Sequence, residues 1–532
     1  MSQYQALHHF DTSYTITMLI RQFRQADYEA ALSETIRIGD QLPPTHLARW
    51  LASVLDTLDL TPFYSRYALI GAPPYAPEII LGLLLYGYMT GITSPRAIEQ
   101  AVQESLPFRF LAANTRPDAS TLTRFRSTML PLVAGIFAQV LARARQEGFV
   151  RAHPIVSIDG SKIQANASKH HAVSYQYACR LRDELLAQTA DLLALADTDV
   201  PEGMEVTTEI LLRLEALEHL DMALAVIEAR ADHRYQTALA EYQSKIAARA
   251  EAAERSGRKP GGRPPAPPSP LPAPGAQYNF TDPESRVMKN STDKGFNQCY
   301  NAQIAVEQTG RFIVGYALSN HPNDKAEATA ALDAIPPCVG VPAAAALDTG
   351  YFSLHNIEQL EERGTIPLIA CRKQVHGLNW ERFHQPRENA PSPDEASPLE
   401  RMIFALDTTF GHDIYSRRKS TVEPVFGILK SIQRFRQFSL RGEACAGDEL
   451  GIVCLAYNLK RLFTCQASAL KKAKLFCGHY GTKILCFACS YFRGRSRGGM
   501  MPRQGYGGPA NSRAATWELA SPTDGWRFAS GC

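Results

Sequence analysis

The pattern of apolar positions divides the chain into a helical first part and an α/β second part. Up to about residue 150, apolar residues recur every three or four positions in short runs, which is the spacing of amphipathic helices. Turns separate the runs, as at Gly91–Pro95, where Ser94 can cap a helix that has Pro95 at its first position. We therefore expect a helical domain over residues 1–150.

The last of these helices carries cations near its start. Asp118 or Ser120 can cap a helix whose first turns expose Arg124 and Arg126. Short helices joined by tight turns, with arginines at the start of the last one, fit a helix-turn-helix DNA reader. A plain helical bundle explains the same residues equally well, so both interpretations stay open.

A second helical pattern lies farther along the chain. Apolar residues form a stripe at three- and four-residue spacing between Ile210 and Ile246, with a break near residues 199–203. The pattern predicts a helical insertion over residues 179–256, folded as an antiparallel arm of two long helices. A coiled-coil seam between two copies is the alternative.

Residues 257–276 change composition abruptly and are rich in proline, glycine and basic side chains. Such a segment cannot pack a core and is typical of an extended linker. Its piece Gly262-Arg263-Pro264 is similar to the core of an AT-hook, in which an extended arginine enters the A·T minor groove. Arg263 is therefore a candidate DNA contact, although a simple linker explains the segment as well.

The α/β part alternates strand and helix patterns. A β-branched run from His153 ends in Asp159-Gly160 and predicts a buried strand with its carboxylate at a turn. Beyond the linker, the patterns predict a hairpin around residues 308–310, a small-residue strand ending at Asp348, and further elements at 353–363, 366–370 and from Tyr415. These predict an α/β core from residues 151–178 and 277–465, a mixed sheet flanked by helices. Asp324 is placed to cap a helix through Leu332.

Three carboxylates occupy comparable places in this pattern. Asp159 and Asp348 are near predicted strand ends, and Glu423 is near the start of a predicted helix. If the first and fourth strands are neighbours, Asp159 and Asp348 lie side by side and a helix on that face can present Glu423. Converging carboxylates repel unless they bind cations. Hard oxygen ligands suit Mg²⁺ or Mn²⁺, and two such ions can drive chemistry at phosphorus.

Each carboxylate also has a purely structural explanation. Asp-Gly commonly just makes a turn, and Ser420 to Glu423 fits a helix capping box. Pro424 argues against the box, because it would delete the first intrahelical hydrogen bond; with Thr421 as the cap, Glu423 stays available. The local pattern therefore favours a functional Glu423.

The bulk composition restricts the class of protein only loosely. The 532 residues are 45% hydrophobic and 20% charged, which is ordinary for a soluble protein of two to four domains. The formal net charge of +3 means that nucleic-acid binding must come from local basic patches. We expect no secretion signal, no membrane span and no disulfide framework, and hence a cytoplasmic protein.

Three motifs together resemble the bacterial insertion-sequence transposases of the DDE type. They are Ile158-Asp159-Gly160, Leu347-Asp348-Thr349-Gly350-Tyr351-Phe352, and the signature formed by Tyr415, Arg418, Glu423 and Lys430. The resemblance runs from about residue 60 to 465 and is nearest to the branch with a helical N-terminal domain and a long insertion after the first aspartate. Arg418 stands five positions before Glu423, where the commoner signature has four and this chain has Lys419.

The resemblance implies an RNase H-like catalytic core and DNA transposition with two Mg²⁺ or Mn²⁺ ions, for which Asp159, Asp348 and Glu423 are both the catalytic residues and the metal ligands. It implies double-stranded DNA as partner, both transposon ends and target, a homodimer or higher oligomer on that DNA, and action at the nucleoid. A nuclease without strand transfer and an inactive DNA-binding protein are the alternatives. Including the N-terminal and linker cations, the candidate DNA contacts are Tyr415, Arg418, Lys419, Lys430, Arg434, Arg124, Arg126 and Arg263.

Lys430 follows Glu423 by seven positions, two helical turns, so both face one side and Lys430 can reach a phosphate, with Arg434 and Arg436 expected on the same helix. Weaker candidates are His153, His170 and His171 as metal ligands. Residues 466–532 are rich in glycine and arginine, and Cys477, His479, Cys486 and Cys489 could form a zinc knuckle. The favoured interpretation is a disordered or non-native extension.

Overall fold

A computed structural model describes residues 37–68, 73–196, 205–257, 263–289, 295–325, 327–371 and 396–479. By contacts, residues 1–467 form one compact unit and residues 468–532 a second. The elements described below belong to the first unit, except the end of the last helix.

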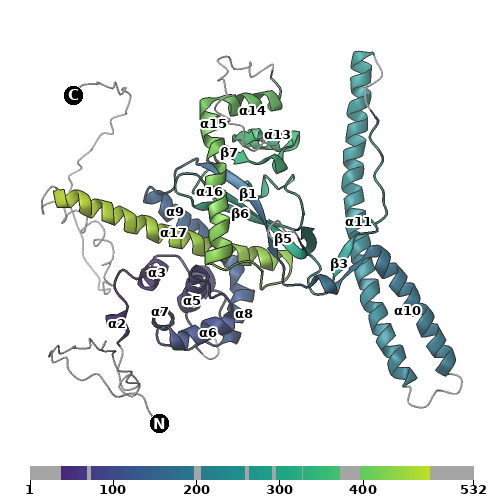
Figure 1. Ribbon diagram of the computed structural model, residues 1–532, viewed down its shortest axis with the longest axis horizontal. Helices are drawn as coiled ribbons and strands as arrows, with labels where there is room; N and C mark the ends of the chain where they lie inside the picture. Colours follow the sequence, from purple (N-terminus) through teal and green to yellow (C-terminus); the bar gives the residue numbers. More distant parts are fainter. Residues whose placement is uncertain are drawn as a thin grey trace, which may run out of the picture. The chain divides into compact units, whose positions relative to one another are not determined.

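The N-terminal region is helical, as the apolar spacing predicts (Figure 1). Its helices are α2 (Ile38–Gln41), α3 (Leu47–Leu55), α4 (Thr61–Tyr64), α5 (Pro77–Thr90), α6 (Pro95–Glu104), α7 (Leu106–Leu111), α8 (Ala119–Met129) and α9 (Val133–Gln146). Two predicted caps are confirmed: the Ser94 side chain accepts from the Ala97 N–H, and the Asp118 side chain accepts from the Thr121 N–H. Each satisfies a helix-end donor that would otherwise lack a partner.

These helices surround α5, which is apolar on nearly all sides and buried over most of its length. A helix that is hydrophobic all round belongs in the interior of a bundle. In the described part of the chain, one stretch, Ala119–Gln146 across α8 and α9, is long and apolar enough to cross a membrane, and half of it is buried against the protein. Burial of this kind is expected of apolar helices in the core of a helical bundle.

A mixed sheet of six strands forms the second part of the fold. Its strands are β1 (Ile155–Gln164), β4 (Arg286–Lys289), β5 (Phe296–Glu307), β6 (Ile313–Ser319), β7 (Ala344–Leu347) and β8 (Ile366–Ile369). The order is β4-β5-β1-β7-β8, with β6 also paired to β5. The predicted hairpin is confirmed, because β5 and β6 pair antiparallel around residues 308–310.

The predicted neighbourhood of the first and fourth strands is also confirmed. β1 and β7 pair in parallel, with Ile155 opposite Ala344 and Ser157 opposite Ala346. β7 is four residues long, all fully buried, and the small alanines let helices approach it closely from either face. The prediction that β1 ends at Asp159-Gly160 is wrong, because β1 continues to Gln164 through antiparallel pairing with β5.

Helices cover the sheet. They are α12 (Ala330–Asp333), α13 (Leu354–Glu362), α14 (Pro398–Asp407), α15 (Thr409–Ser416) and α16 (Arg418–Gly427), which continues into a π-helical turn at Ile428–Ile432. α16 packs against β1 and β5, and α15 packs against β7. Ser353 caps α13 as its sequence indicates, and Gly364 ends that segment at φ 74°, where a side chain would be strained.

In the region predicted as a helical insertion, the structure has a hairpin of α10 (Tyr175–Ala196) and α11 (Val206–Ser256), which pack against each other (Figure 1). Its connecting residues, including the predicted break near 199–203, lie outside the described residues. A small sheet of β2 (Ala172–Ser174) and β3 (Gln277–Asn279) stands where the hairpin leaves and rejoins the core.

The last helix crosses the predicted boundary at residue 465, and the two compact units divide close to it, after residue 467. α17 runs from Glu443 to His479, so no break in secondary structure falls at residue 465. Its apolar residues from Leu450 to Leu462 are buried in the same core as the sheet and the N-terminal helices. Cys477 and His479 therefore fall within a helix, while Cys486 and Cys489 lie outside the described residues.

Candidate active site

Asp159 and Asp348 lie at the same edge of the sheet. The parallel pairing of β1 with β7 stops at Ser157 and Ala346, and Asp348 directly follows β7. The carboxyl ends of adjacent parallel strands open onto one crevice, which is where α/β sheets commonly place ligands. The Asp159 Oδ1 accepts from the Gly160 N–H at 2.9 Å, and the Asp348 Oδ1 accepts from the Gly350 N–H at 2.8 Å.

The charges of these carboxylates interact. Burial raises the pKa of Asp159 to about 7, the charge of Arg418 opposes this, and the charges of Asp348 and Asp324 add to the increase. Carboxylates placed together in a poorly hydrated position resist ionisation unless a cation joins them. Such a perturbed group in a crevice marks a candidate functional site.

Arg418 supplies a cation at this position. Its side chain is 7% exposed, and its Nη1 lies 3.6 Å from the Asp159 Oδ2. Nη1 is also a buried donor without a hydrogen-bond partner among the described residues. Lys419, the other candidate for the signature cation, is exposed, whereas Arg418 is buried. The cation that faces the carboxylates is therefore Arg418.

Tyr415 stands one turn before Arg418, at the end of α15. Its side chain is partly buried, and this burial raises the pKa of its hydroxyl. The charge of Arg418 lowers that pKa, and the charge of Asp348 raises it further. Tyr415 thus belongs to the same group of side chains as Arg418 and Asp348.

Glu423 stands elsewhere on α16. The helix begins at Arg418, so the expectation that Glu423 lies at a helix start is wrong, and Pro424 lies inside the helix. Neither Ser420 nor Thr421 caps it, because both hydroxyls donate back to the Arg417 carbonyl. The Glu423 side chain is exposed, and the face of α16 turned to the sheet carries Arg418, Thr421, Val422, Val425 and Phe426 instead.

The Lys430 side chain contacts β1, the strand that carries Asp159. It lies in the π-helical turn that follows α16, and its Nζ donates to the Ser161 Oγ at 2.6 Å and to the Lys162 carbonyl at 3.3 Å. Burial lowers the pKa of its ammonium. Ser161 follows Asp159 by two positions on the same face of β1. π-helical turns are frequent at functional sites.

A third aspartate, Asp324, enters this region from the loop after β6. The expectation that it caps a helix is wrong, since α12 begins only at Ala330 with Thr329 before it. Its Oδ1 accepts from the Asn301 Nδ2 at 2.7 Å and from the Gln303 Nε2 at 2.9 Å, both on β5. No local signal in the sequence marks it, because its partners stand about twenty residues earlier.

These carboxylates fit a divalent cation by their chemistry but do not form a closed cage. Among the described residues, no three His, Cys, Asp or Glu side chains are grouped closely enough to hold a metal ion as they stand. The donor set of Asp159 and Asp348 is nonetheless the hard oxygen type that Mg²⁺ and Mn²⁺ prefer. His153 instead contacts the Val341 carbonyl, and His171 contacts the Thr281 hydroxyl.

Arg126 is not available to DNA, which corrects the prediction that both α8 arginines are exposed. Its side chain is 3% exposed and pairs with Glu449 of α17 at 2.7 Å. The Tyr88 hydroxyl of α5 donates to the same carboxylate at 2.9 Å. Arg124 is exposed, as predicted. The buried pair joins the N-terminal helices to the core.

Two other candidate DNA contacts lie away from regular elements. Arg263 is exposed in an extended segment, and Gly262 of its motif lies outside the described residues. Arg434 is exposed with φ 56°. The expectation that Arg434 and Arg436 share a helix with Lys430 is wrong, because the helix ends at Ile432; the Arg436 Nε instead donates to the Lys430 carbonyl.

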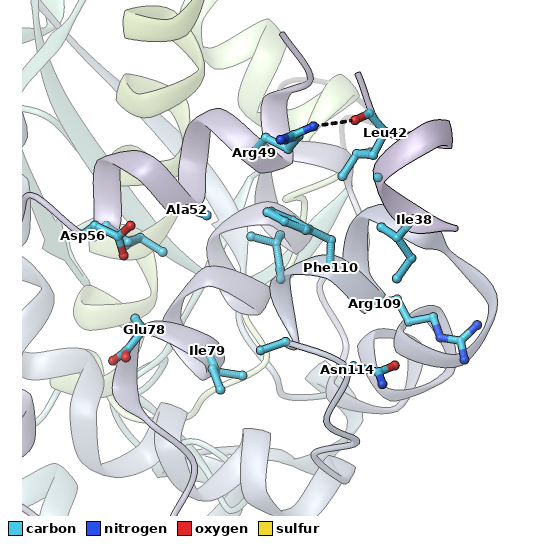
Figure 2. A pocket seen from close by; sticks show the side chains of 14 residues that line it. Ile38, Leu42, Arg49, Ala52, Asp56, Glu78, Ile79, Arg109, Phe110 and Asn114 are labelled. Atoms are coloured by element: carbon cyan, nitrogen blue, oxygen red, sulfur yellow. Dashed lines mark hydrogen bonds between the residues drawn. The ribbon is translucent and has the colours of Figure 1, made fainter. Parts of the chain in front are cut away.

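A cavity of about 620 Å³ lies in the N-terminal region, away from the carboxylates. Figure 2 shows its lining from α2, α3, α5 and α7, largely apolar, with Arg49 donating to the Leu42 carbonyl. No titratable group of the carboxylate site lines it. The carboxylate site and this cavity are thus in separate places.

Comparisons with known proteins agree with the motifs. Residues 36–128 match the model of a transposase domain (DUF772), and residues 268–459 match the model of a transposase DDE domain. The first covers helices α2 to α8, and the second covers the strands and helices from β3 through Asp348 to the first part of α17. No curated protein and no solved structure matched the chain.

Proposed function

The chain belongs to the insertion-sequence transposases of the DDE type, and from this premise we propose that it cleaves and joins DNA at the ends of its own element. The substrate is double-stranded DNA, both terminal inverted repeats and target. The observation that supports catalysis best is the juxtaposition of Asp159, on β1 just beyond its pairing with β7, and Asp348, directly after β7, with Arg418 facing Asp159.

Asp159, Asp348 and Glu423 would hold two Mg²⁺ or Mn²⁺ ions, with Asp159 shared between them. When bound, the ions supply an activated water and neutralise charge that develops at phosphorus. The exposed Glu423 would complete the set as DNA and ions bind. Glu423 can move without loss of core packing, since its side chain stands outside the core.

The proposed reaction has two displacements at phosphorus. Water attacks the phosphodiester at the transposon end, the bond from phosphorus to the 3′-oxygen breaks, and that oxygen leaves as a free 3′-hydroxyl. The hydroxyl then attacks a target phosphate, releasing another 3′-oxygen, so no covalent protein intermediate forms. Lys430 and Arg418 would contact phosphate oxygens beside the scissile bond, as their charge and their nearness to Asp159 suggest.

The proposed organisation follows from this function. The domain of residues 1–150 would bind the repeats through Arg124, and an RNase H-like core of residues 151–178 and 277–465 would carry the chemistry, acting as a homodimer or higher oligomer in the cytoplasm at the nucleoid. Lys419, Arg434 and Arg263 are exposed cations that would contact the phosphate backbone. Tyr415 would position Arg418.

A second function is favoured by one observation, the exposed Glu423 without a carboxylate partner in the described structure. It is sequence-specific DNA binding without catalysis. A nuclease that cuts without joining has the same site and differs only in its products.

The experiment incubates the protein with labelled transposon-end DNA, target DNA and Mg²⁺. Joined products support transposition, cleavage alone supports a nuclease, and salt-sensitive binding without either supports the inactive protein. Asp159→Ala, Asp348→Ala and Glu423→Ala should each abolish cleavage, while Glu358→Ala, an exposed glutamate of α13, should not. A folded Asp159→Ala protein that still cleaves would contradict the metal site.

A further inference from the structure

We infer that Asp324 is an additional carboxylate of the metal site, acting together with Asp159 and Asp348. The inference rests on the proposed function, because it concerns how that site holds its cations. Asp324 lies in the loop after β6, and its charge acts on both Asp159 and Tyr351, the residue that follows the Asp348 turn.

The sheet holds one oxygen of Asp324, Oδ1, through two donors on β5. Oδ1 accepts from Asn301 and Gln303, which stand two positions apart on β5 and therefore point to the same face. The Tyr351 hydroxyl donates to the Gln303 Oε1. Because the Gln303 oxygen faces Tyr351, its amide nitrogen faces Asp324. The orientation of this amide group is therefore fixed, and its nitrogen donates to Asp324.

Glycines clear the path between Asp324 and the other two aspartates. Gly160 pairs with Gln303 in the register of β1 and β5, and a Cβ at residue 160 would overlap the Gln303 Nε2 and come within 2.7 Å of the Asp324 Oδ1. A Cβ at Gly350 would lie 2.9 Å from the Asp348 Oδ1 and 3.7 Å from the Asp324 Oδ2. Gly160 thus makes room for Asp324, whereas Gly350 makes room for the Asp348 carboxylate and lies within contact distance of Asp324.

The alternation of β1 explains from which sides the three carboxylates approach this edge of the sheet, where they do not form a closed metal cage as they stand. Asp159 points to the face covered by α16, and Gly160 points to the opposite face, where Gln303 lies. β7 no longer pairs with β1 beyond Ser157, so among the described residues only β5 still pairs with β1 at this point. Asp324 approaches from the face opposite to α16, through the space that Gly160 leaves.

Arg418 gives independent evidence that this place receives a ligand. Its Nη1 is buried, faces Asp159 and has no hydrogen-bond partner in the described part of the chain. A buried donor without an acceptor costs about 1–3 kcal/mol, more when it is charged, so an acceptor from outside the described residues would stabilise it. A phosphate oxygen of DNA would supply that acceptor. Cations bound with the phosphate would balance the negative charge of the aspartates.

The test measures Mn²⁺ binding to the full chain by calorimetry, without DNA and without turnover. Asp324→Asn keeps an oxygen that accepts from Asn301 and Gln303, so the loop retains its anchors while the charge is removed. We expect Mn²⁺ affinity to fall by about 10-fold or more, the usual range for a residue that supports a metal site. Asp324→Glu, which restores the charge, should recover part of that loss.

Gly160→Ala provides a second variant that removes no carboxylate. Its Cβ would displace Gln303 and Asp324, so Mn²⁺ affinity should fall here too. Asp191→Asn, an exposed aspartate on the α10 arm, is the matched control and should bind Mn²⁺ as wild type. Thermal melting of each variant checks that it remains folded.

The outcomes separate the inference from the proposed function. If Asp159→Asn loses Mn²⁺ binding while a folded Asp324→Asn binds within twofold of wild type, Asp324 is not part of the site and the inference is wrong. If Asp159→Asn also binds as wild type, the metal site itself is wrong, and the inference is overturned with it.

Discussion

Arg124 and Arg126 stand two positions apart on α8 and have opposite surroundings. Arg124 is in solvent, while Arg126 is enclosed with Glu449, Tyr88 and Ser439. Glu449 also accepts from the backbone N–H groups of Ser439 and Leu440. At the scale of a single residue, burial therefore decides whether an arginine can bind DNA or holds the fold together.

Replacing Arg126 with Met should destabilise the protein by about 3–5 kcal/mol, because Glu449 would remain buried without its cation. Arg124→Ala is the matched control and should leave stability within about 0.5 kcal/mol, as for most surface substitutions. Urea denaturation measures both. Equal stability of the two variants would mean that the buried pair contributes nothing.

The same pair of variants separates DNA binding from folding. Arg124→Ala should weaken binding to transposon-end DNA and lower the salt dependence of that binding by about one counterion, as the loss of one phosphate contact would. Titration of labelled DNA at several salt concentrations measures the slope. An unchanged slope would remove Arg124 from the interface.

At the scale of elements, close approach between backbones fixes which helices can pack. Gly411 of α15 lies against the backbone of α14, where an added Cβ would overlap the Ala405 carbonyl and lie 2.8 Å from its carbon. Gly427 ends α16 with no atom within 4 Å of an added Cβ and with helical backbone angles. Close packing of α14 on α15 thus requires a glycine at residue 411, whereas residue 427 has space for a side chain.

Gly411→Ala should lower the free energy of unfolding, because two backbones must separate to admit a methyl group. Gly427→Ala should raise it by up to about 1 kcal/mol, the difference in helix propensity between glycine and alanine. Thermal melting of both variants provides the comparison. A stabilised Gly411→Ala protein would show that α14 and α15 adjust freely.

At the scale of the whole molecule, the N-terminal helices and the sheet share one core. Trp50 of α3 donates to Gln466 of α17 at 2.7 Å, and Lys460 of α17 donates to the Met89 carbonyl of α5 at 2.8 Å. One continuous apolar cluster contains residues of α5, β5 and α17. The proposed DNA-binding and catalytic parts are thus coupled through α17.

Native-state hydrogen exchange should therefore show amides of α5 and β5 opening with the same free energy, as parts of one cooperative unit. The distal turns of α10 and α11, which pack mainly on each other, should open at lower free energy and serve as the internal reference. Exchange of α5 through a separate, easier opening would contradict the shared core.

The sequence by itself determined the local features. Caps at Ser94, Asp118 and Ser353 follow from side chains that bond within three residues, and the β5–β6 hairpin follows from a short turn between two apolar runs. The order of strands even suggested that Asp159 and Asp348 are neighbours. All these depend on short-range chemistry or on strand order, which the chain displays directly.

Only the tertiary structure decided the environment of single side chains. Arg126 is buried because it pairs with Glu449 of α17, which follows it by 323 residues in the sequence. Arg418 rather than Lys419 faces Asp159 because of how α16 packs on β1. Gly160 leaves the space beside Gln303 that Asp324 occupies. Such pairings depend on contacts between distant segments, and nothing in the local pattern of residues records them.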